Sequence, residues 1–342
     1  MKHAFPVLTL ALLLAGCASL PKPSYSGQHF DLKALDKGVY AAIHRFGGAA
    51  ICNVGIVNTG DATIVFDAFL SPDAAAELIA AVRKRGLPPI RYVVNSHAHN
   101  DHVRGNQVFG PEVRIISTRQ TAETIRQEEP RAIEAEKGYA KGQFEFFDRN
   151  MREYTGDTTA RAYLTMKMMR PYFEELSKSH EKIKTRLPDT FVDKEMTLSG
   201  PKNTVILRDM GSCHSGSDLV MYLPKRKILF AGDIAFNEFH PYLGDGNVDD
   251  WRTALRQLQK LDIRLVTPGH GEVGGKAMLA RLITYMDDLE AIAAGLAKND
   301  RPLTEAETRR IPTPYAAWWL ENFYADNLKW MYAKALKAPS GK

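Results

Sequence analysis

Histidine and aspartate crowd into one short stretch of this 342-residue chain, HAHNDH at residues 97–102, directly after an apolar run. Imidazole nitrogen and carboxylate oxygen are ligands that Zn²⁺ and similar transition-metal ions prefer. Side chains two positions apart in an extended segment share one side, so His97 and His99 can face one metal. Asp101 and His102 follow a turn and can face a second point close by. The spacing therefore indicates a metal site divided between two ions.

Such a site needs further ligands, and three candidates lie far along the chain. They occur in MGSCHSGSD, LFAGD and VTPGHG, each beside small residues and at the beginning or end of an expected strand. Small neighbours let the backbone approach closely, and the loops at strand ends are where α/β proteins often place functional residues. The candidate ligands are then His97, His99, Asp101, His102, His214, Asp233 and His270.

Taken in order, HAHNDH, the His of CHSGSD, the Asp of AGD and the His of PGHG resemble the metallo-β-lactamase superfamily of metallohydrolases, from about residue 38 to 290. The resemblance implies an α/β fold, the αββα four-layer sandwich, with the site along one edge of two packed sheets. It also implies two Zn²⁺ ions, with Fe or Mn possible. The first ion would be held by His97, His99 and His214, the second by Asp101, His102 and His270, and Asp233 would bridge them.

The same resemblance implies a dinuclear hydrolase that uses a metal-bridging hydroxide to cleave an ester, thioester, lactone or β-lactam bond of a small-molecule substrate. Asp101 and Asp233 are its expected catalytic carboxylates, with Asp101 orienting the hydroxide and moving a proton. Asp67, in IVFDAF, matches the position of an acidic residue that the family keeps behind a metal-bound histidine. We expect its carboxylate to accept a hydrogen bond from the ring N–H of one ligand histidine. The alternative is an ordinary aspartate in a turn.

Other activities remain open on the same residues. The best-known β-lactamases of the superfamily carry Cys or Ser where this chain has Asp233, so a resemblance in fold does not set the substrate. With iron, the ligands would suit a sulfur dioxygenase-type oxidoreductase. A non-catalytic envelope lipoprotein is the third alternative, although none of the seven ligands is missing.

Two further residue types carry open alternatives. Cys52 and Cys213 are expected as buried free thiols, and a disulfide between them is the alternative that an exported protein permits. Cys213 also precedes a candidate ligand and could itself offer a soft ligand. His240, in FNEFHPYLGDG, is expected either to contact substrate or to lie in a surface loop.

The N-terminus predicts export. A short basic start precedes an apolar run too short to span a membrane, and the run ends in Leu-Ala-Gly-Cys17, which resembles the lipobox of bacterial lipoproteins. We expect a signal peptide at 1–16, a membrane anchor through lipidated Cys17 and a linker at 17–37. Ala18 favours the outer membrane, facing the periplasm. The charge of +5 is spread along the chain and indicates no nucleic-acid partner.

The elements that would position the site alternate in type. Residues 49–70 predict a β-hairpin or meander, and Pro72 opens an alanine-rich helix that ends at Gly86. One domain is expected over 38–298, with a helical insert at about 119–187 that either packs on the body or covers the active site. Residues 299–342 predict a helical tail that packs on the domain.

Overall fold

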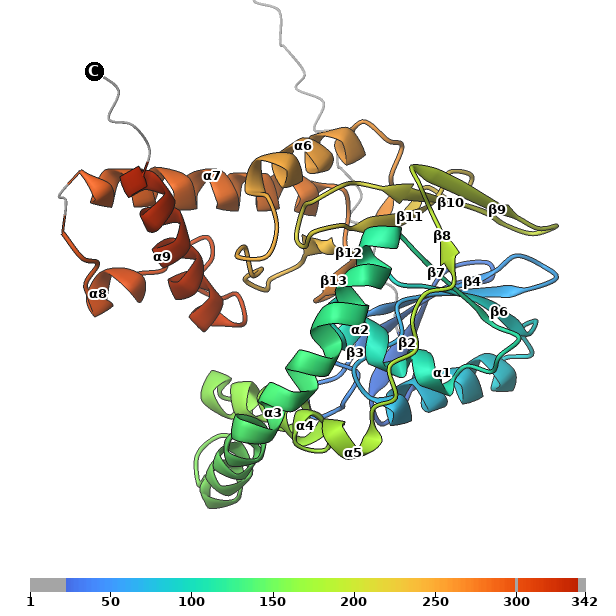
Figure 1. Cartoon of the computed structure of the whole chain (residues 1–342), viewed down its shortest axis with the longest axis horizontal. Coiled ribbons are helices and arrows are strands. Elements are labelled where there is room, and N and C mark those ends of the chain that lie inside the picture. Colours follow the sequence, from blue (N-terminus) through green and yellow to red (C-terminus); the bar gives the residue numbers. More distant parts are fainter. Residues whose placement is uncertain (1–22, 299–300, 338–342) are drawn as a thin grey trace, which may run out of the picture.

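The computed structural model describes residues 23–298 and 301–337. In this part of the chain, two β-sheets pack face to face and helices lie on their outer sides (Figure 1). The predicted signal peptide and Cys17 lie outside the described residues.

The first sheet has eight strands in the order of the sequence, β1 to β8. The pairs from β1 to β5 are antiparallel, and the pairs from β5 to β8 are parallel. The strands are β1 (Pro23–Ser26), β2 (Phe30–Asp36), β3 (Val39–His44), β4 (Val54–Asn58), β5 (Thr63–Phe66), β6 (Ile90–Val94), β7 (Arg114–Ser117) and β8 (Thr190–Phe191).

The second sheet has five strands in the order β13-β12-β11-β10-β9. All of its pairs are antiparallel except β12 with β13, whose carboxyl ends therefore meet at the same edge. The strands are β9 (Glu195–Ser199), β10 (Thr204–Asp209), β11 (Leu219–Leu223), β12 (Ile228–Phe236) and β13 (Leu265–His270).

Apolar side chains hold these layers together. Phe66 of the first sheet and Phe230 of the second belong to the core between the sheets, with ring centroids 6.3 Å apart. Val65, which points the opposite way along β5, packs with α1 (Pro72–Lys84) on the outer face of the first sheet. On the other side, α6 (Val248–Gln259) and α7 (Ala277–Ala297) cover the second sheet. The order helix, sheet, sheet, helix confirms the predicted αββα four-layer sandwich.

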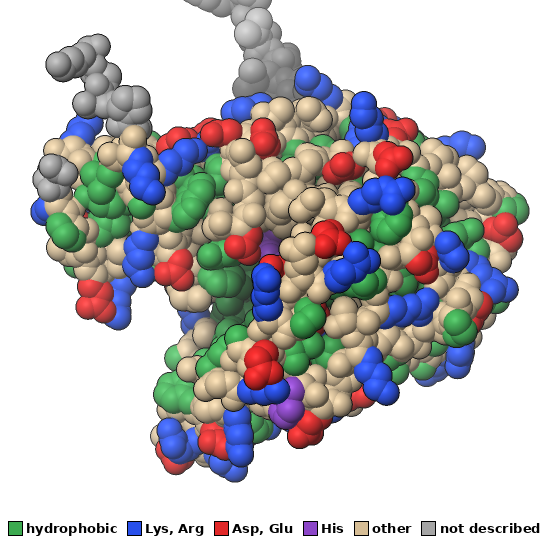
Figure 2. All heavy atoms as spheres, viewed as in Figure 1, with side chains coloured by type: hydrophobic (Ala, Val, Ile, Leu, Met, Phe, Trp, Pro, Cys, Tyr) green, Lys and Arg blue, Asp and Glu red, His purple; other side chains and the backbone are tan. Residues whose placement is uncertain are grey.

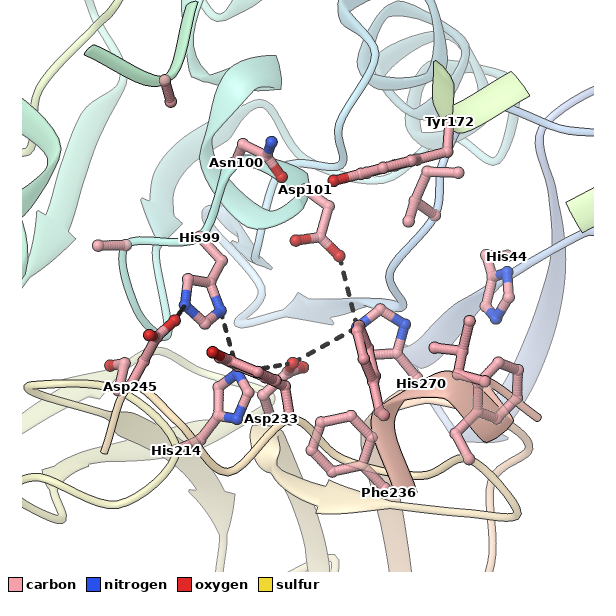
Figure 3. Close-up of a pocket in the computed structure, with 18 of the residues that line it drawn as sticks. His44, His99, Asn100, Asp101, Tyr172, His214, Asp233, Phe236, Asp245 and His270 are labelled. Atoms are coloured by element: carbon pink, nitrogen blue, oxygen red, sulfur yellow. Dashed lines mark hydrogen bonds and ion pairs between the residues drawn. The ribbon is translucent and has the colours of Figure 1, made fainter. Parts of the chain in front are cut away.

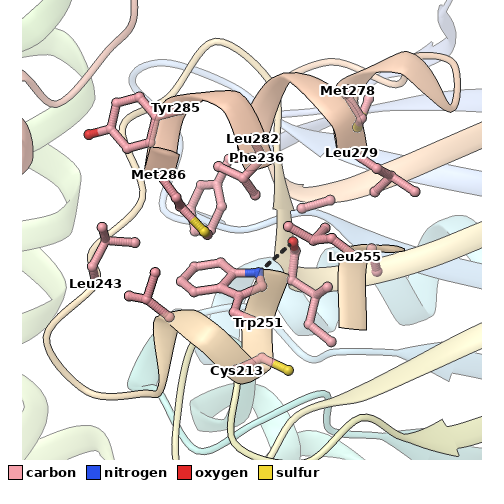
Figure 4. Packing of buried hydrophobic residues seen from close by; sticks show 14 of the residues in the cluster. Cys213, Phe236, Leu243, Trp251, Leu255, Met278, Leu279, Leu282, Tyr285 and Met286 are labelled. Carbon is pink, nitrogen blue, oxygen red and sulfur yellow. Dashed lines mark hydrogen bonds between the residues drawn. The ribbon is translucent and has the colours of Figure 1, made fainter. Parts of the chain in front are cut away.

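Local sequence explains where the covering helices begin. The Ser71 side chain accepts a hydrogen bond from the Asp73 N–H, and Pro72 opens α1. Asn247 caps α6 in the same way, accepting bonds from the N–H groups of its first turn. Trp251 on α6 is fully buried, and its indole N–H donates to the Ile234 carbonyl at 3.0 Å (Figure 4). This bond satisfies a polar atom that would otherwise be stranded in the core.

The hairpin predicted at 49–70 is confirmed as β4 and β5, but the predicted linker at 17–37 is wrong from residue 23 onward. There β1 and β2 extend the first sheet, and β2 pairs with β3 over most of its length. Phe30 and Leu32 of β2 are fully buried. Their burial against the outer core outweighs the linker-like Pro and Ser residues just before them.

The insert forms three helices, α3 (Arg119–Glu153), α4 (Arg161–Ser177) and α5 (Ser179–Lys182). Its attachment to the body includes a buried charge cluster beside the HAHNDH segment. Arg104, in the 3₁₀-helix Arg104–Val108 that follows the short helix α2 (Asn100–Val103), donates to Glu129 and Glu136 of α3 at 2.7 Å each. All three side chains are buried, so α3 is tied to the loop that carries the candidate ligands.

The described part of the tail forms α8 (Glu305–Thr308) and α9 (Glu321–Lys337). Tyr324, Leu328 and Met331 of α9 are buried in the same core as α7, which agrees with a tail that packs on the domain. No helix within the described residues has the length and apolar character needed to cross a membrane.

Candidate metal centre

The seven candidate ligands converge at one edge of the two sheets. Residues 97–102 follow β6, whose carboxyl end faces this edge. Asp233 lies inside β12 and His270 ends the neighbouring parallel strand β13. His214 lies in the loop between β10 and β11. Four separate chain segments thus deliver their side chains to one place (Figure 3).

Three histidines form the first group. His99 Nδ1 lies 3.0 Å from His97 Nε2 and 3.0 Å from His214 Nε2. Asp233 Oδ2 lies 3.2 Å from His214 Nε2, which adds a carboxylate to the same point. Atoms of these four residues all fall within 4.8 Å of one another. Zn–N distances of about 2.0–2.1 Å place two ligand nitrogens on one ion a little over 3 Å apart, so this spacing fits a shared ion.

Asp101, His102 and His270 form the second group. Asp101 Oδ2 lies 3.5 Å from His102 Nε2 and 3.4 Å from His270 Nε2. Asp233 also reaches this group, because its Oδ1 lies 3.2 Å from His102 Nε2 and its Oδ2 3.4 Å from His270 Nε2. The Asp233 carboxylate therefore stands between the two groups.

Unpartnered polar atoms test whether these residues fit metal ions. His102 Nε2 and Asp233 Oδ1 are buried and make no hydrogen bond among the described residues, although both face the site. Buried polar atoms without partners are uncommon in folded proteins, and those at an imidazole–carboxylate cluster are explained by an ion. The donor set of nitrogen and carboxylate oxygen suits Zn²⁺, and the residues fit two ions.

Asp67 lies behind this centre and orients two of its histidines. Its Oδ2 lies 3.0 Å from His102 Nδ1, and its two oxygens accept bonds from the Ser96 N–H and hydroxyl at 2.7 and 2.9 Å. The Ser96 hydroxyl oxygen is in turn 2.9 Å from His97 Nδ1. These bonds assign the ring protons of His97 and His102 to Nδ1, which leaves each Nε2 free to face the site.

Asp245 does the same for His99 from the loop after β12. Its Oδ2 lies 3.1 Å from His99 Nε2, so the lone pair of His99 Nδ1 faces the other ligands. Sequence reasoning missed Asp245. The only local signal is the GDG sequence at 244–246, which is typical of a turn.

Burial and neighbouring charges adjust the protonation of the centre. Burial lowers the pKa of His214 to about 3 and that of His97 well below its ordinary value, so both rings are neutral and able to bind a metal at neutral pH. Burial alone would raise the pKa of Asp233, but the surrounding histidines hold it well below its usual range. The carboxylate is therefore ionised.

Close packing fixes the Asp233 carboxylate from behind. A Cβ built on Gly269 would overlap Asp233 Oδ1, so only glycine leaves room for the carboxylate there. Gly232 has φ +52°, and a Cβ on it would come within 2.6 Å of the Ser96 Cβ. The glycines of LFAGD and VTPGHG thus let neighbouring side chains approach the backbone closely, as the sequence suggested.

A cleft of roughly 980 Å³ opens above the centre. Figure 2 shows a hollow between the end of the molecule that holds α8 and α9 and the end that holds α3 and α4. Helices α3 and α4 line the cleft together with the start of α9, so the insert packs on the body and also forms part of the active-site wall. In Figure 3 the Tyr172 hydroxyl of α4 points toward Asn100 and Asp101.

His44 belongs to this cleft although its sequence neighbours suggest no site. It ends β3, and its ring centroid lies 6.1 Å from that of His270. Burial lowers its pKa to about 3, so the ring is neutral. Only the folded sheet brings it near the centre, which is why a search for local motifs does not find it.

His240, in contrast, lies neither against the cleft nor in an exposed loop. It is fully buried, with Nδ1 3.2 Å from the Tyr285 hydroxyl, and both positions expected from the sequence are wrong. Cys52 and Cys213 are buried free thiols, as expected. Cys213 packs in the core beside Trp251 (Figure 4), and its Sγ–H donates to the Met210 carbonyl. It belongs to neither ligand group.

Comparisons with known proteins agree with this geometry. The family profile described as "Metallo-beta-lactamase superfamily" matches residues 47–123 and 127–270. The chain is similar to "Metallo-beta-lactamase type 2" of Bacillus cereus, with 25% identity over 265 residues that cover 75% of this chain and 82% of the relative. The protein of the same description from Bacillus sp. (strain 170) is 24% identical over the same shares. A solved structure of TMB-1 aligns with a TM-score of 0.51 and 16% identity, over 75% of this chain and 96% of that one, which shows a shared fold.

Proposed function

Because the chain belongs to the metallo-beta-lactamase superfamily, we propose that it is a hydrolase that uses two divalent metal ions to cleave an ester, thioester, lactone or β-lactam bond. The position of Asp233 carries the proposal. Its two carboxylate oxygens lie 3.2 Å from His214 Nε2 and 3.2 Å from His102 Nε2, one in each ligand group. A carboxylate in that place serves two ions at once.

The ligand roles follow from the two groups. His97, His99 and His214 would hold one ion, Asp101, His102 and His270 the other, and Asp233 would bridge them. When bound, two such ions lower the pKa of a shared water toward neutrality and polarise the bond to be cleaved.

Asp101 is the carboxylate best placed to handle a proton. It lines the cleft, and its side chain is 13% exposed, compared with 5% for Asp233. From this position Asp101 would orient the attacking water and carry a proton to the leaving group. Neutral His44 and the hydroxyl of Tyr172 lie at the rim of the same centre, where they can contact a bound substrate.

The test is a panel of β-lactams, lactones, thioesters, esters and phosphodiesters on zinc-loaded protein, with a chelator control. We expect two metal equivalents per chain and chelator-sensitive turnover of an acyl-type substrate. Less than one equivalent, together with turnover that a chelator leaves unchanged, would reject the proposal. Metal analysis of protein from its native host then distinguishes zinc from iron or manganese.

Asp101→Asn separates binding from turnover. The amide keeps the shape of the side chain and an oxygen ligand but cannot take up a proton. We expect the variant to retain metal and to lose most of its kcat. Full activity would remove the proposed role of Asp101.

We also propose that the protein is exported and anchored to the periplasmic side of the outer membrane through lipidated Cys17. The support is the sequence of residues 1–18 alone. Labelling with a radioactive fatty acid tests it, with fractionation of inner and outer membranes. Cys17→Ser should lose the label and the membrane attachment, and a label that persists in the variant would contradict the proposal.

A further inference from the structure

The cleft above the metal centre has an apolar wall built by the insert. Tyr139 of α3 and Met169, Tyr172 and Phe173 of α4 line it. The ring centroids of Tyr172 and Phe173 are 5.1 Å apart, and Phe173 stacks on Phe147 at 5.6 Å, which holds this wall in place.

The opposite wall is also aromatic. Phe236 stacks on the His270 ring with centroids 5.5 Å apart, and Phe239 lies 6.1 Å from the same ring. Phe323, at the start of α9, continues this wall beside Tyr242 at 5.6 Å. A molecule bound between the two walls would contact carbon on both sides while its reacting bond faces the ligands on the floor.

The charges at the cleft limit what can bind. Among the described residues that line it, Arg45 is the only lysine or arginine. One nitrogen of Arg45 is already engaged, since Nη1 donates to the Gly27 carbonyl at 2.6 Å and lies 3.8 Å from Asp31 Oδ1. Glu128 and Asp245 add negative charge to the lining. A carboxylate, sulfate or phosphate on the distal part of a substrate would meet Arg45 as the one cationic side chain among the described lining residues and would also face the acidic side chains of the lining.

We propose that the substrate is an uncharged ester, thioester or lactone whose acyl part is a long apolar chain lying between these two walls. The proposal rests on the hydrolase function above and narrows it. In the reaction, a water oxygen bonds to the acyl carbon and the bond to the leaving oxygen or sulfur breaks. One proton of the water passes to the leaving group, so no oxidant or reductant is needed.

Hydrolysis of p-nitrophenyl esters by the zinc-loaded full chain provides the first measurement. From acetate through butanoate to octanoate, kcat/KM should rise about two- to fourfold for each added methylene until the cleft is filled. The mono-p-nitrophenyl ester of octanedioic acid has the same chain with a carboxylate at its far end. It should react at least tenfold more slowly than the octanoate. A flat series, or a preference for the charged ester, would overturn the proposal.

Binding provides a measurement that does not depend on turnover. Hydroxamic acids are uncharged metal chelators, so octanohydroxamic acid should bind zinc-loaded protein with a Kd at least tenfold below that of acetohydroxamic acid, as measured by calorimetry. Equal Kd values would contradict the apolar acyl site. If the tenfold ratio holds but no substrate in the panel is hydrolysed, the hydrolase function fails while the binding site stands.

Two aromatic residues on α3 offer a matched pair of variants. Tyr139 is 46% exposed and lines the cleft, whereas Phe146 is 49% exposed on the same helix and does not line it. Tyr139→Ser should reduce the ratio of the two hydroxamate Kd values by at least threefold, and Phe146→Ser should leave it within error. Similar thermal unfolding of both variants shows that the fold is intact. An effect of equal size in the two variants would count against the assigned wall.

Discussion

The carboxylate of Asp67 and the imidazole of His102 meet at 3.0 Å although 35 positions separate them in the sequence. Asp67 sits directly after β5 with a left-handed backbone, φ +70°, which non-glycine residues rarely adopt. This backbone conformation, together with the two bonds from Ser96, aims the carboxylate at the back of the metal centre. Strained backbone is often found at functional sites, and here it accompanies a residue that orients ligands.

Asp67→Asn should weaken zinc binding by about 10- to 100-fold, because the negative charge that holds the His102 Nδ1–H is lost. Competition with a chromophoric chelator measures the affinity. Asp193→Asn is the control, since the Asp193 side chain is 86% exposed and belongs to neither ligand group. Unchanged affinity in the Asp67 variant would show that the contact does not support the metal.

Gly269→Ala should lower the bound metal from two equivalents to one or fewer. The added methyl would occupy the place of Asp233 Oδ1, so the bridging carboxylate must move. Elemental analysis after dialysis measures the metal content. Gly275→Ala is the matched control because a Cβ there meets nothing within 4 Å. Two equivalents in both variants would refute the bridging position.

Arg104→Met should destabilise the protein by about 3–5 kcal/mol, because it leaves the carboxylates of Glu129 and Glu136 buried without a partner. Urea unfolding gives the free energy. Arg126→Met removes an arginine from an exposed pair with Glu123 on the same helix, and its effect should stay below about 1 kcal/mol. Equal losses of unfolding free energy in the two variants would mean that burial of the Arg104 cluster adds no stability.

His240 should make the fold sensitive to acid. Burial lowers its pKa to about 4, with opposing smaller effects from Glu321 and Arg161. Above the unfolded pKa near 6.5 the ring is neutral in both states, so its burial costs no stability. As the pH falls from 6.5 toward 4, the ring takes up a proton in the unfolded state but not in the folded state, so the free energy of unfolding decreases. Between pH 6.5 and 4 the free energy of unfolding of His240→Gln should decrease by about 3 kcal/mol less than that of the unmodified protein. Urea unfolding with chelator present measures this difference.

The exposed His180 provides the control for this pH dependence, because its side chain is 38% exposed. His180→Gln should follow the unmodified protein at every pH. If His240→Gln also follows it, the buried ring is not the source of the acid sensitivity.

The sequence predicts which residues converge at the candidate metal centre, and it does so for a physical reason. Metal ligands that share one strand end are neighbours in sequence, as His97, His99 and His102 are, and their spacing is readable. The distant partners His214 and His270 sit beside glycine or serine, which leaves a recognisable pattern. The sandwich is implied by the resemblance that these motifs carry, whereas the strand and helix periods between them predict only two β-rich halves that end in helices.

Residues that reach the site through the fold alone leave no such pattern. His44 lies beside the centre because β3, in the first sheet, lies opposite β13. Asp245 contacts His99 because the loop after β12 folds back over it. His240 is misplaced for the converse reason. A polar residue in a Gly- and Pro-rich loop reads as exposed, whereas packing against Tyr285 and the tail buries it completely.

The Arg104 cluster also bears on how a substrate enters. Arg104, which holds Glu129 and Glu136 of α3, lies only two positions after His102, so these bonds tie the insert to the ligand-bearing loop. A swing of α3 away from the cleft would expose two carboxylates and a guanidinium, or leave them unpaired, at considerable cost. The cleft lies between the insert and the start of α9, so a substrate need not displace α3 to reach the metal centre. Exchange of substrate and product should therefore proceed without a swing of α3.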